Sequence, residues 1–379
     1  MRQWARRVGG AICAAALSFV TGCGSFWVYP GSLNGSTSSN GDYVYVANAT
    51  TSSLAGFSVG TGTLTAVSGS PYTLGFVPTA AVVNPADTIL FVGSTSQIYA
   101  YAIGSGGVLS ALNSGSAVAI ANVVAMDISP DGQWLFALDG NGSTLDEFAI
   151  NSTTGLLTNE VQTNYSSVIS GTVSKGNIKV APSGAYVFVA LGTAGDLVYT
   201  FNTVSTSGAL SSPLYVAPLS SATSDNALAV SPNSSTLFIA RSNGTSPGTL
   251  SSYTIGSGGV LGLPVTIGTT GVQPFAVVVN AAGSDVYVAD RSDSTITGFS
   301  VASNGTLTTL ALSPYSSGPE VSALAVDKSG DYLLAVANGG SPDLTMYSFD
   351  STTAGKLDLS ATIATGTDPT GAVALAATH

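Results

Sequence analysis

The sequence predicts an all-β protein, a seven-bladed β-propeller with four-stranded blades in which the N- and C-terminal strands share one blade. Three observations lead to this prediction. The composition, with 45 glycines and only 8% charged residues in a chain of 379, suits short strands joined by tight turns. Hydrophobic stretches recur with a period of about 48 residues. Partial repeats stand at the two ends of the chain, and together they supply one further unit.

Six segments share one order of elements: a hydrophobic run, a turn, a second hydrophobic run, a polar gap, an alternating strand, and a glycine turn before a short last strand. They begin at Pro78, Val123, Gly176, Asn226, Pro274 and Val321. Equivalent residues of the first turn are Pro85, Pro130, Pro182, Pro232, Ala281 and Lys328, with spacings of 45, 52, 50, 49 and 47. Four strands repeated at this period are typical of propeller blades.

The two ends of the chain complete the seventh unit. The C-terminal segment PTGAVALAAT, from Pro369, matches the first strand of the unit that begins at Pro274. The N-terminal segment NGDYVYVANATTSSLAGFSVGTGTLTAV, from Asn40, matches the second, third and fourth strands. We therefore expect the last strand and the first three to build one shared blade, which closes the ring and removes an open sheet edge.

The strands of each unit differ in composition. First strands such as AAVV and FAVVV are almost wholly apolar, and their alanines suit the narrow centre of a propeller. Third strands alternate, and we expect their aromatic side chains to pack between blades. These aromatic residues are Tyr99, Tyr101, Phe148, Tyr199, Phe201, Tyr253, Phe299, Tyr347 and Phe349.

Residues 1–22 are typical of a secretory signal peptide, because a basic start is followed by an apolar stretch from Val8 to Val20. The run VTGC that ends at Cys23 resembles the bacterial lipobox, in which a peptidase cuts before the cysteine and the cysteine is acylated. An ordinary signal peptide cut nearby is the alternative. The only other cysteine, Cys13, lies in the leader, so an internal disulfide is excluded from the mature chain.

The predicted organisation is a signal peptide at 1–22, a flexible Gly- and Ser-rich tether at 23–40, and the propeller at 41–379. Acyl chains on Cys23 would anchor the protein to a membrane by burial of methylene groups. Gly24 follows the cysteine, which for such lipoproteins implies the outer membrane or cell surface of a diderm bacterium. We expect an extracytoplasmic, lipid-anchored monomer.

The net charge excludes some partners. Three of the nine basic residues lie in the leader, so the mature chain holds six basic and twenty acidic residues. Binding to nucleic acid depends on many cationic contacts with phosphates, and we expect none here.

The units VYVADRSDSTITGFSV and SPDGQWLFALDGNGSTLDEFAI resemble the seven-bladed lactonase family, which includes propeller-type 6-phosphogluconolactonases and merges into YVTN-repeat surface proteins. The resemblance extends from about residue 41 to the end. It implies a Pro-His pair at the start of an inner strand, with arginine and acidic residues on the same face. Here the matching prolines are followed by Thr79, Phe275 and Thr370, whereas Asp290-Arg291 matches the family's Asp-Arg pair.

Inner-strand starts and second-strand ends face one rim of a propeller, so charged residues at these points form the candidate site. A lactonase needs a base to activate water and a cation to stabilise the oxyanion. The candidate catalytic residues are Arg291 and Arg241 as an electrophilic pair, with Glu320 or Asp225 as the base. The candidate binding residues are Asp290, Asp139, Lys175 and Asp368. Since His379 is the sole histidine, we expect no metal site and no cofactor.

Two functions remain open from the sequence. The first is a binding or scaffold module of the cell envelope whose ligand is a glycan or an envelope protein. The second is a lactonase that hydrolyses a sugar lactone at a rim site around Arg241 and Arg291. The missing Pro-His pair favours the first, and the Asp290-Arg291 pair favours the second.

Overall fold

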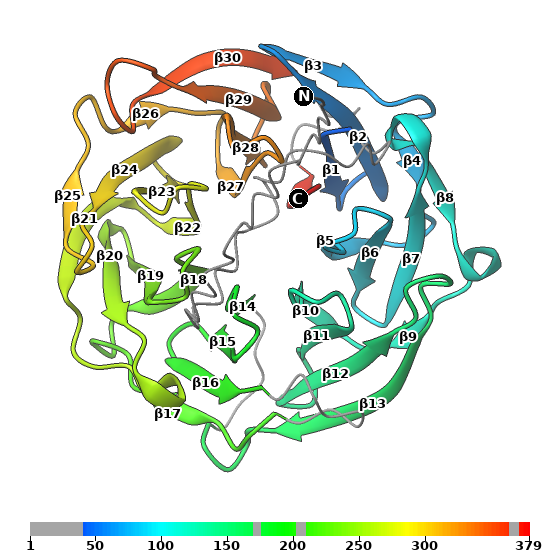
Figure 1. Ribbon diagram of the computed structural model, residues 1–379, viewed down its shortest axis with the longest axis horizontal. Coiled ribbons are helices and arrows are strands. Elements are labelled where there is room, and N and C mark those ends of the chain that lie inside the picture. Colours follow the sequence, from blue (N-terminus) through cyan, green and yellow to red (C-terminus); the bar gives the residue numbers. More distant parts are fainter. Residues whose placement is uncertain (1–40, 170–175, 202–209, 364–370) are drawn as a thin grey trace, which may run out of the picture.

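The computed structural model describes residues 41–169, 176–201, 210–363 and 371–379. It confirms the predicted fold class: seven antiparallel sheets, each with four main strands, are arranged radially around a central axis (Figure 1). The described residues contain strands and three short 3-10 turns, η1 (Ser105–Gly107), η2 (Asn113–Gly115) and η3 (Ser257–Gly259). No helix among them is long and apolar enough to cross a membrane.

We number the blades in chain order, starting from the blade that the two ends of the chain share. The strands of each blade are given from the innermost to the outermost. Blade 1 holds β31 (Ala372–Ala377), β1 (Tyr43–Asn48), β2 (Ser53–Gly60) and β3 (Thr63–Ala66), with β4 (Tyr72–Thr73) beside β2. Blade 2 holds β5 (Pro78–Val83), β6 (Ile89–Ser94), β7 (Gln97–Ile103) and β8 (Leu109–Ala111), with β9 (Ala119–Ile120) beside β7. Blade 3 holds β10 (Val123–Ile128), β11 (Trp134–Asp139), β12 (Thr144–Ile150) and β13 (Leu157–Asn164).

The remaining blades follow the same order. Blade 4 holds β14 (Asn177–Val180), β15 (Tyr186–Ala190), β16 (Asp196–Thr200) and β17 (Leu214–Val216). Blade 5 holds β18 (Ser224–Val230), β19 (Thr236–Asn243), β20 (Ser246–Thr254) and β21 (Thr266–Val272). Blade 6 holds β22 (Pro274–Val279), β23 (Asp285–Asp290), β24 (Thr295–Val301) and β25 (Leu307–Thr309), with β26 (Tyr315–Ser316) beside β24. Blade 7 holds β27 (Val321–Val326), β28 (Tyr332–Ala337), β29 (Leu344–Phe349) and β30 (Leu357–Ile363).

The ring closes as the sequence predicts, with the C-terminal strand innermost in the blade that the N-terminal strands complete. β31 pairs antiparallel with β1, and Val44 lies opposite Ala377. At the end of this pair, the N–H of Tyr43 in β1 donates to Thr378 Oγ1 at 2.9 Å, and the Thr378 N–H donates to the Tyr43 carbonyl at 2.9 Å. These bonds join residues 335 apart in the chain and fasten the C-terminal strand to the first N-terminal strand, which closes the ring of blades.

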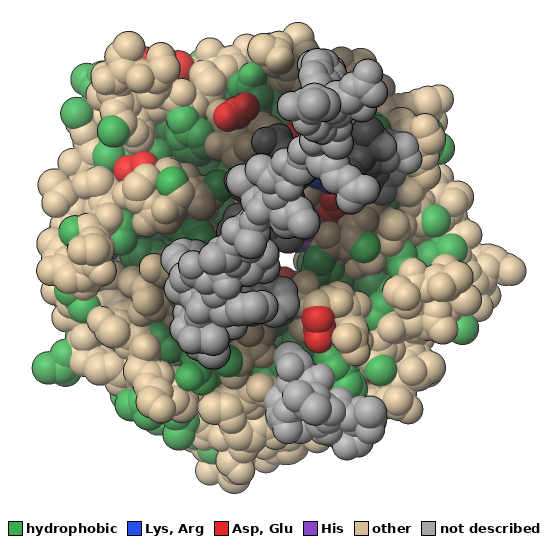
Figure 2. All heavy atoms as spheres, in the orientation of Figure 1, with side chains coloured by type: hydrophobic (Ala, Val, Ile, Leu, Met, Phe, Trp, Pro, Cys, Tyr) green, Lys and Arg blue, Asp and Glu red, His purple; other side chains and the backbone are tan. Residues whose placement is uncertain are grey.

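The core of the described residues is divided into seven hydrophobic clusters, one between each pair of neighbouring blades. The expected third-strand aromatics belong to these clusters, except Tyr99, which stacks on Phe76. For example, Phe201 of blade 4 packs edge-on against Phe136 of blade 3, with ring centroids 5.0 Å apart. Buried apolar area is the main favourable term in folding, so blade-on-blade packing holds the ring together. Charged side chains are sparse on the face in Figure 2, where acidic residues form isolated spots.

Candidate functional site

One rim of the ring is formed where inner strands begin and second strands end, and a repeated β-bulge shapes it. In six blades the pairing of the inner strand with the second strand shifts by one residue at this point. The extra residues are Thr79, Val124, Asn226, Phe275, Ser322 and Val373. A bulge redirects a side chain, and here it redirects one side chain per blade at the rim.

Three of these bulge residues connect neighbouring blades. The Thr79 hydroxyl donates to the Val123 carbonyl at 2.7 Å, and the Asn226 amide donates to the Pro274 carbonyl at 2.8 Å. The Ser322 hydroxyl donates to the Ala372 carbonyl at 3.1 Å. In each case the acceptor belongs to the next blade, so these side chains satisfy backbone groups at the blade junctions.

Phe275, the bulge residue of blade 6, supports a charged side chain instead. The guanidinium carbon of Arg291 lies 4.9 Å from the centre of the Phe275 ring, within cation–π range. Arg291 Nη2 donates to Glu320 Oε2 at 2.8 Å and to Asn338 Oδ1 at 3.3 Å. The Arg291 side chain is 27% exposed and the Glu320 side chain is 54% exposed, so solvent and ligands can reach both.

Asn338 fixes this arrangement from blade 7. Its amide donates to the Ala372 carbonyl of blade 1 at 2.8 Å, while its oxygen accepts from Arg291. The Asn338 N–H donates to the Glu320 carbonyl at 3.0 Å, and Glu320 adopts a positive φ of 54°. The structure therefore brings together Arg291, Glu320, Asn338 and Phe275, which we call the rim cluster, from blades 6 and 7.

Arg241 and Asp225, the other two residues expected in this site, lie elsewhere. Both are fully buried: Arg241 Nε lies 2.6 Å from Asp225 Oδ1, and Arg241 Nη2 lies 3.7 Å from Asp196 Oδ2 of blade 4. Burial raises the pKa of Asp196 well above its usual range, the negative charge of Asp225 adds to the effect, and Arg241 opposes it. The expected pairing of the two arginines at the rim is thus not observed, because Arg241 contacts blade 4 and Arg291 contacts blade 7.

The strand register explains why the two arginines differ. Arg241 lies opposite Asp225 and Asp290 lies opposite Pro274, so Arg241 is equivalent to Asp290. Arg291 is one residue further along. Since side chains alternate between the two faces of a strand, a shift of one residue changes a buried position into an exposed one.

The two acidic residues at second-strand ends have local partners. Asp290 is fully buried, and its Oδ2 accepts from the Thr297 hydroxyl at 2.5 Å. Asp139 accepts from the N–H groups of Asn141 and Gly142, both at 2.6 Å, and from the Asn122 N–H at 3.0 Å. Asp139 therefore holds a turn, as a side chain that caps backbone donors.

Three predicted site residues, Lys175, Asp368 and the lipidation site Cys23, lie outside the described residues. So does Thr370, which follows a matching proline. Within the described parts of the chain, no group of three His, Cys, Asp or Glu side chains is placed to hold a metal ion.

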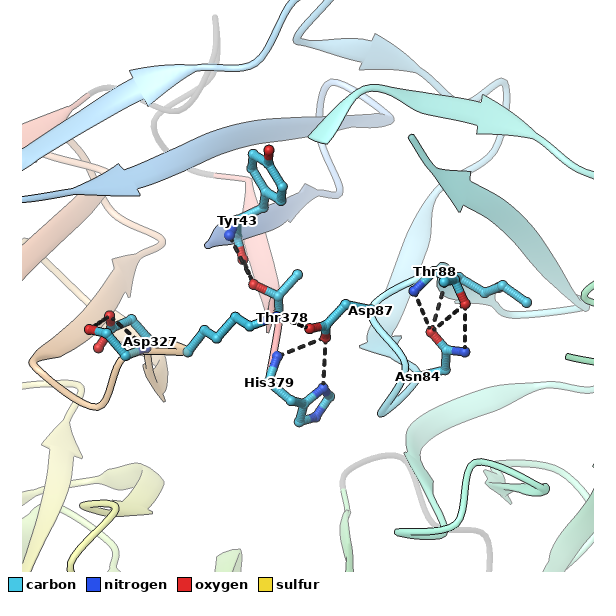
Figure 3. Close-up of polar contacts among 10 residues, drawn as sticks. Tyr43, Asn84, Asp87, Thr88, Asp327, Thr378 and His379 are labelled. Atoms are coloured by element: carbon cyan, nitrogen blue, oxygen red, sulfur yellow. Dashed lines mark hydrogen bonds and ion pairs between the residues drawn. The ribbon is translucent and has the colours of Figure 1, made fainter. Parts of the chain in front are cut away.

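The opposite end of the inner strands carries a second polar cluster that the sequence did not predict (Figure 3). Asp87, in the β5–β6 turn, accepts from Lys328 Nζ at 2.6 Å and from the His379 N–H at 2.8 Å. Burial alone would raise the pKa of Asp87, but hydrogen bonds from His379 and Lys328 outweigh it and lower the pKa. This contact ties the C-terminal strand to blades 2 and 7.

Asp42, beside this cluster, is paired with another carboxyl group. The pKa of Asp42 is raised to about 8, mainly by burial and also by a hydrogen bond with Asp327 and the charge of Asp327, whereas backbone N–H groups of Lys328 and Ser329 lower it.

Sequence reasoning missed Asn338 and the role of Phe275. Asn338 stands at the position in blade 7 that Arg291 occupies in blade 6, one residue past the end of the second strand. Alignment of all second-strand ends, rather than of charged residues alone, would have found it. Phe275 is one of three residues that follow prolines matching the Pro-His pair, but nothing in the sequence indicates that its ring lies beside the Arg291 guanidinium.

Comparisons with known proteins agree with the architecture. Residues 263–373 match the profile of the family described as "Lactonase, 7-bladed beta-propeller". No curated protein sequence matches the chain. A candidate 6-phosphogluconolactonase of Bacteroides fragilis is similar in structure, with a TM-score of 0.70 at 16% identity over 91% of this chain and 100% of that one.

Two further solved structures are similar. A protein of Lactobacillus plantarum has a TM-score of 0.68 at 20% identity, over 89% of this chain and 99% of that chain. The periplasmic gluconolactonase of Pseudomonas aeruginosa has a TM-score of 0.66 at 17% identity, over the same shares of the two chains. At such identities the likeness shows the fold. The resemblance to the seven-bladed lactonase family is therefore confirmed in sequence over residues 263–373, and the likeness of the whole propeller to the solved structures is one of fold.

Proposed function

We propose that this protein is an extracytoplasmic lactone hydrolase that acts on a neutral sugar lactone at the rim cluster. The observation that carries the proposal is the position of Arg291, a partly exposed cation fixed by Glu320, Asn338 and Phe275. The likeness to the lactonase profile, and to a structure described as a periplasmic gluconolactonase, supports this reaction class.

The rim cluster supplies the two groups that the reaction needs. Both hydrogen bonds of Arg291 to described residues come from Nη2, so Nη1 and Nε face no described acceptor and can donate to a lactone carbonyl oxygen. Glu320 is exposed enough to accept a proton from a water molecule. The water oxygen bonds to the acyl carbon, the ring C–O bond breaks, and the proton passes to the ring oxygen, which gives the hydroxy acid. Arg291 stabilises the negative charge that develops on the carbonyl oxygen.

A neutral substrate fits the charge distribution better than a phosphorylated one. Of the five basic side chains in the described residues, four are already paired with carboxylates: Arg241, Arg291, Lys328 and Lys356. A phosphate group is normally held by several unpaired donors or cations. The rim cluster contains one arginine, and its nearest charged partner is negative.

A second function, ligand binding without hydrolysis, is favoured by one specific observation. None of the three prolines that match the family's Pro-His pair is followed by histidine: the next residues are Thr79, Phe275 and Thr370, none of which can act as a histidine does in proton transfer. In that case the protein would be a lipid-anchored binding module of the cell envelope, and a glycan or envelope protein would bind at the rim cluster.

The two functions are separated by pH-stat hydrolysis of a panel of neutral and phosphorylated lactones. We expect saturable hydrolysis of a neutral lactone, with slower turnover of its 6-phosphate. Arg291→Ala should lower kcat/KM by roughly 10²–10³-fold, as loss of one oxyanion donor does. Lys356→Ala is the matched control, because Lys356 is also a half-buried, ion-paired cation but belongs to the β29–β30 turn. If every lactone were hydrolysed only at the background rate, the result would favour the second function, ligand binding without hydrolysis.

A further inference from the structure

The rim cluster is built on a pair of positions that recurs from blade to blade. In blade 7, Glu320 precedes the inner strand, Asn338 follows the second strand, and the Asn338 N–H donates to the Glu320 carbonyl at 3.0 Å. In blade 6 the same two positions hold Gln273 and Arg291, and the Arg291 N–H donates to the Gln273 carbonyl at 3.0 Å. The strand registers of the two blades agree on this equivalence. Three of these four residues belong to the rim cluster, and Gln273 is the fourth.

The backbone of Gln273 has an unusual conformation that it shares with Glu320. The residues that the structure describes at this position are Val77, Asn122, Ser224, Gln273, Glu320 and Gly371. Only Gln273, with φ of 57°, and Glu320, with φ of 54°, have a positive φ among them. A residue with a Cβ atom keeps such a conformation where its surroundings enforce it, which is frequent at ligand sites. Both residues adjoin Arg291, Gln273 across the strand pair and Glu320 through the ion pair.

The Gln273 side chain is free to meet a ligand. It is exposed, and within the described parts of the chain its amide has no hydrogen-bond partner. Residues directly opposite in an antiparallel pair have Cβ atoms about 4.5–5.5 Å apart, so the side chains of Gln273 and Arg291 begin close together. Phe275, two residues further along, lies beside the Arg291 guanidinium at 4.9 Å.

The chemistry of this position suits a hydroxyl group. A side-chain amide both donates and accepts hydrogen bonds, as a hydroxyl does, and it carries no charge. The charged groups nearest to it along the rim, apart from Arg291, are carboxylates. Glu320 is paired with Arg291, and Asp293 accepts from the N–H of Val272, the residue before Gln273, at 2.6 Å. These negative groups disfavour a phosphate and leave a neutral hydroxyl as the better partner.

We propose that Gln273 is a specificity-determining residue of the rim cluster. Its amide binds a hydroxyl group of a polyhydroxylated lactone whose carbonyl oxygen is bound by Arg291. This inference rests on the proposed function for the place where the lactone binds. It adds that the protein recognises the hydroxyl groups of its substrate and not the lactone ring alone.

The test is isothermal titration with two lactams, whose amide bond replaces the ester bond that the protein would hydrolyse. Gluconolactam carries the sugar hydroxyl groups, and δ-valerolactam has the same ring without them. Gln273→Gly removes the side-chain amide and keeps the backbone, because glycine adopts a positive φ without strain. We expect this variant to raise the Kd of gluconolactam roughly three- to tenfold, as loss of one hydrogen bond does, and to leave δ-valerolactam binding unchanged. Gln273→Asn retains an amide and tolerates a positive φ, so its Kd should lie between the two.

Asn159→Gly is the matched control. Asn159 also has an exposed amide and a positive φ of 53°, but it lies in β13, the outermost strand of blade 3. Its affinity for both lactams should equal that of the unmodified protein. Equal gluconolactam affinity of Gln273→Gly and the unmodified protein would overturn the proposal. An equal loss of affinity for both lactams, or no saturable binding of gluconolactam by the unmodified protein, would overturn it as well.

The same titration separates this inference from the proposed reaction, because neither lactam is hydrolysed. If lactones were not hydrolysed but Gln273→Gly bound gluconolactam more weakly, the proposed reaction would fail and the role of Gln273 would stand. If lactones were hydrolysed and the lactam affinities did not respond to Gln273→Gly, the reaction would stand and the role of Gln273 would fail.

Discussion

Replacement of Arg241 by methionine tests the buried ion cluster between blades 4 and 5. The substitution removes the guanidinium but keeps an apolar side chain of similar length. Asp225 and Asp196 then remain in a site where the Arg241 and Asp225 side chains have no exposure and Asp196 has 2%. Removal of one partner from a buried ion pair costs about 3–5 kcal/mol, because the remaining charge is left uncompensated.

This cost should appear as a lower midpoint of thermal unfolding. With an unfolding entropy of about 2.1 cal/mol/K per residue, a chain of this length should lose roughly 4–7 °C. Urea unfolding followed by tyrosine and tryptophan fluorescence at pH 8 gives the free energy directly. At pH 5 the loss should be smaller, because burial already raises the pKa of Asp196 and a protonated carboxyl needs no cation.

A further variant separates the ion pair from simple packing. Asp196→Asn, added to Arg241→Met, should restore part of the lost stability, since one buried charge is removed. If Arg241→Met changed the free energy of unfolding by less than about 1 kcal/mol at pH 8, Arg241 would not hold the two carboxylates, and our reading of this cluster would be refuted.

Three other predictions concern the turns, the pH dependence and the anchor. Gly107→Ala should destabilise the protein by about 1–3 kcal/mol more than Gly106→Ala. Both glycines have a positive φ, but only the Cβ atom added at residue 107 would clash, because it would lie 2.5 Å from Tyr43 Cδ1. The pKa of Asp42 is raised from 3.8 to about 8, so the protonated carboxyl group stabilises the fold fully below pH 4, and this contribution is lost as the pH rises through 8. In Asp42→Asn the free energy of unfolding, measured with urea, should therefore change less between pH 4 and pH 8 than in the unmodified protein. Cys23→Ser should release the protein from membrane fractions, and retention there would exclude the lipid anchor.

Much of the fold could be predicted from the sequence because propeller blades repeat. The spacing of Pro85, Pro130, Pro182 and Pro232 indicates the period, and the fragments at the two ends indicate the shared blade. Each blade depends mainly on its neighbours, so a local pattern determines most of the architecture. The one-residue bulges were not predicted, since a strand that is apolar throughout gives no alternation from which to read its register.

The candidate site could be predicted only in part. The sequence placed Arg241 and Arg291 at strand ends, and both are there. It could not show that one is buried and the other exposed, because that depends on a register difference of one residue. It also could not show that Asp196 of blade 4 would lie beside Arg241. Partners from different blades are far apart in the chain, and no local pattern records their contact.

The measurement that tests the central claim most directly is the rate of neutral-lactone hydrolysis per folded molecule, for the unmodified protein, Arg291→Ala and Arg241→Met. Arg291 lies at the accessible rim and Arg241 in the buried cluster. We expect Arg291→Ala to lose about 10²–10³-fold in kcat/KM with little change in stability, and Arg241→Met to lose stability while each folded molecule keeps its activity. Equal turnover by Arg291→Ala and the unmodified protein would contradict the assignment of the rim cluster as the hydrolytic site.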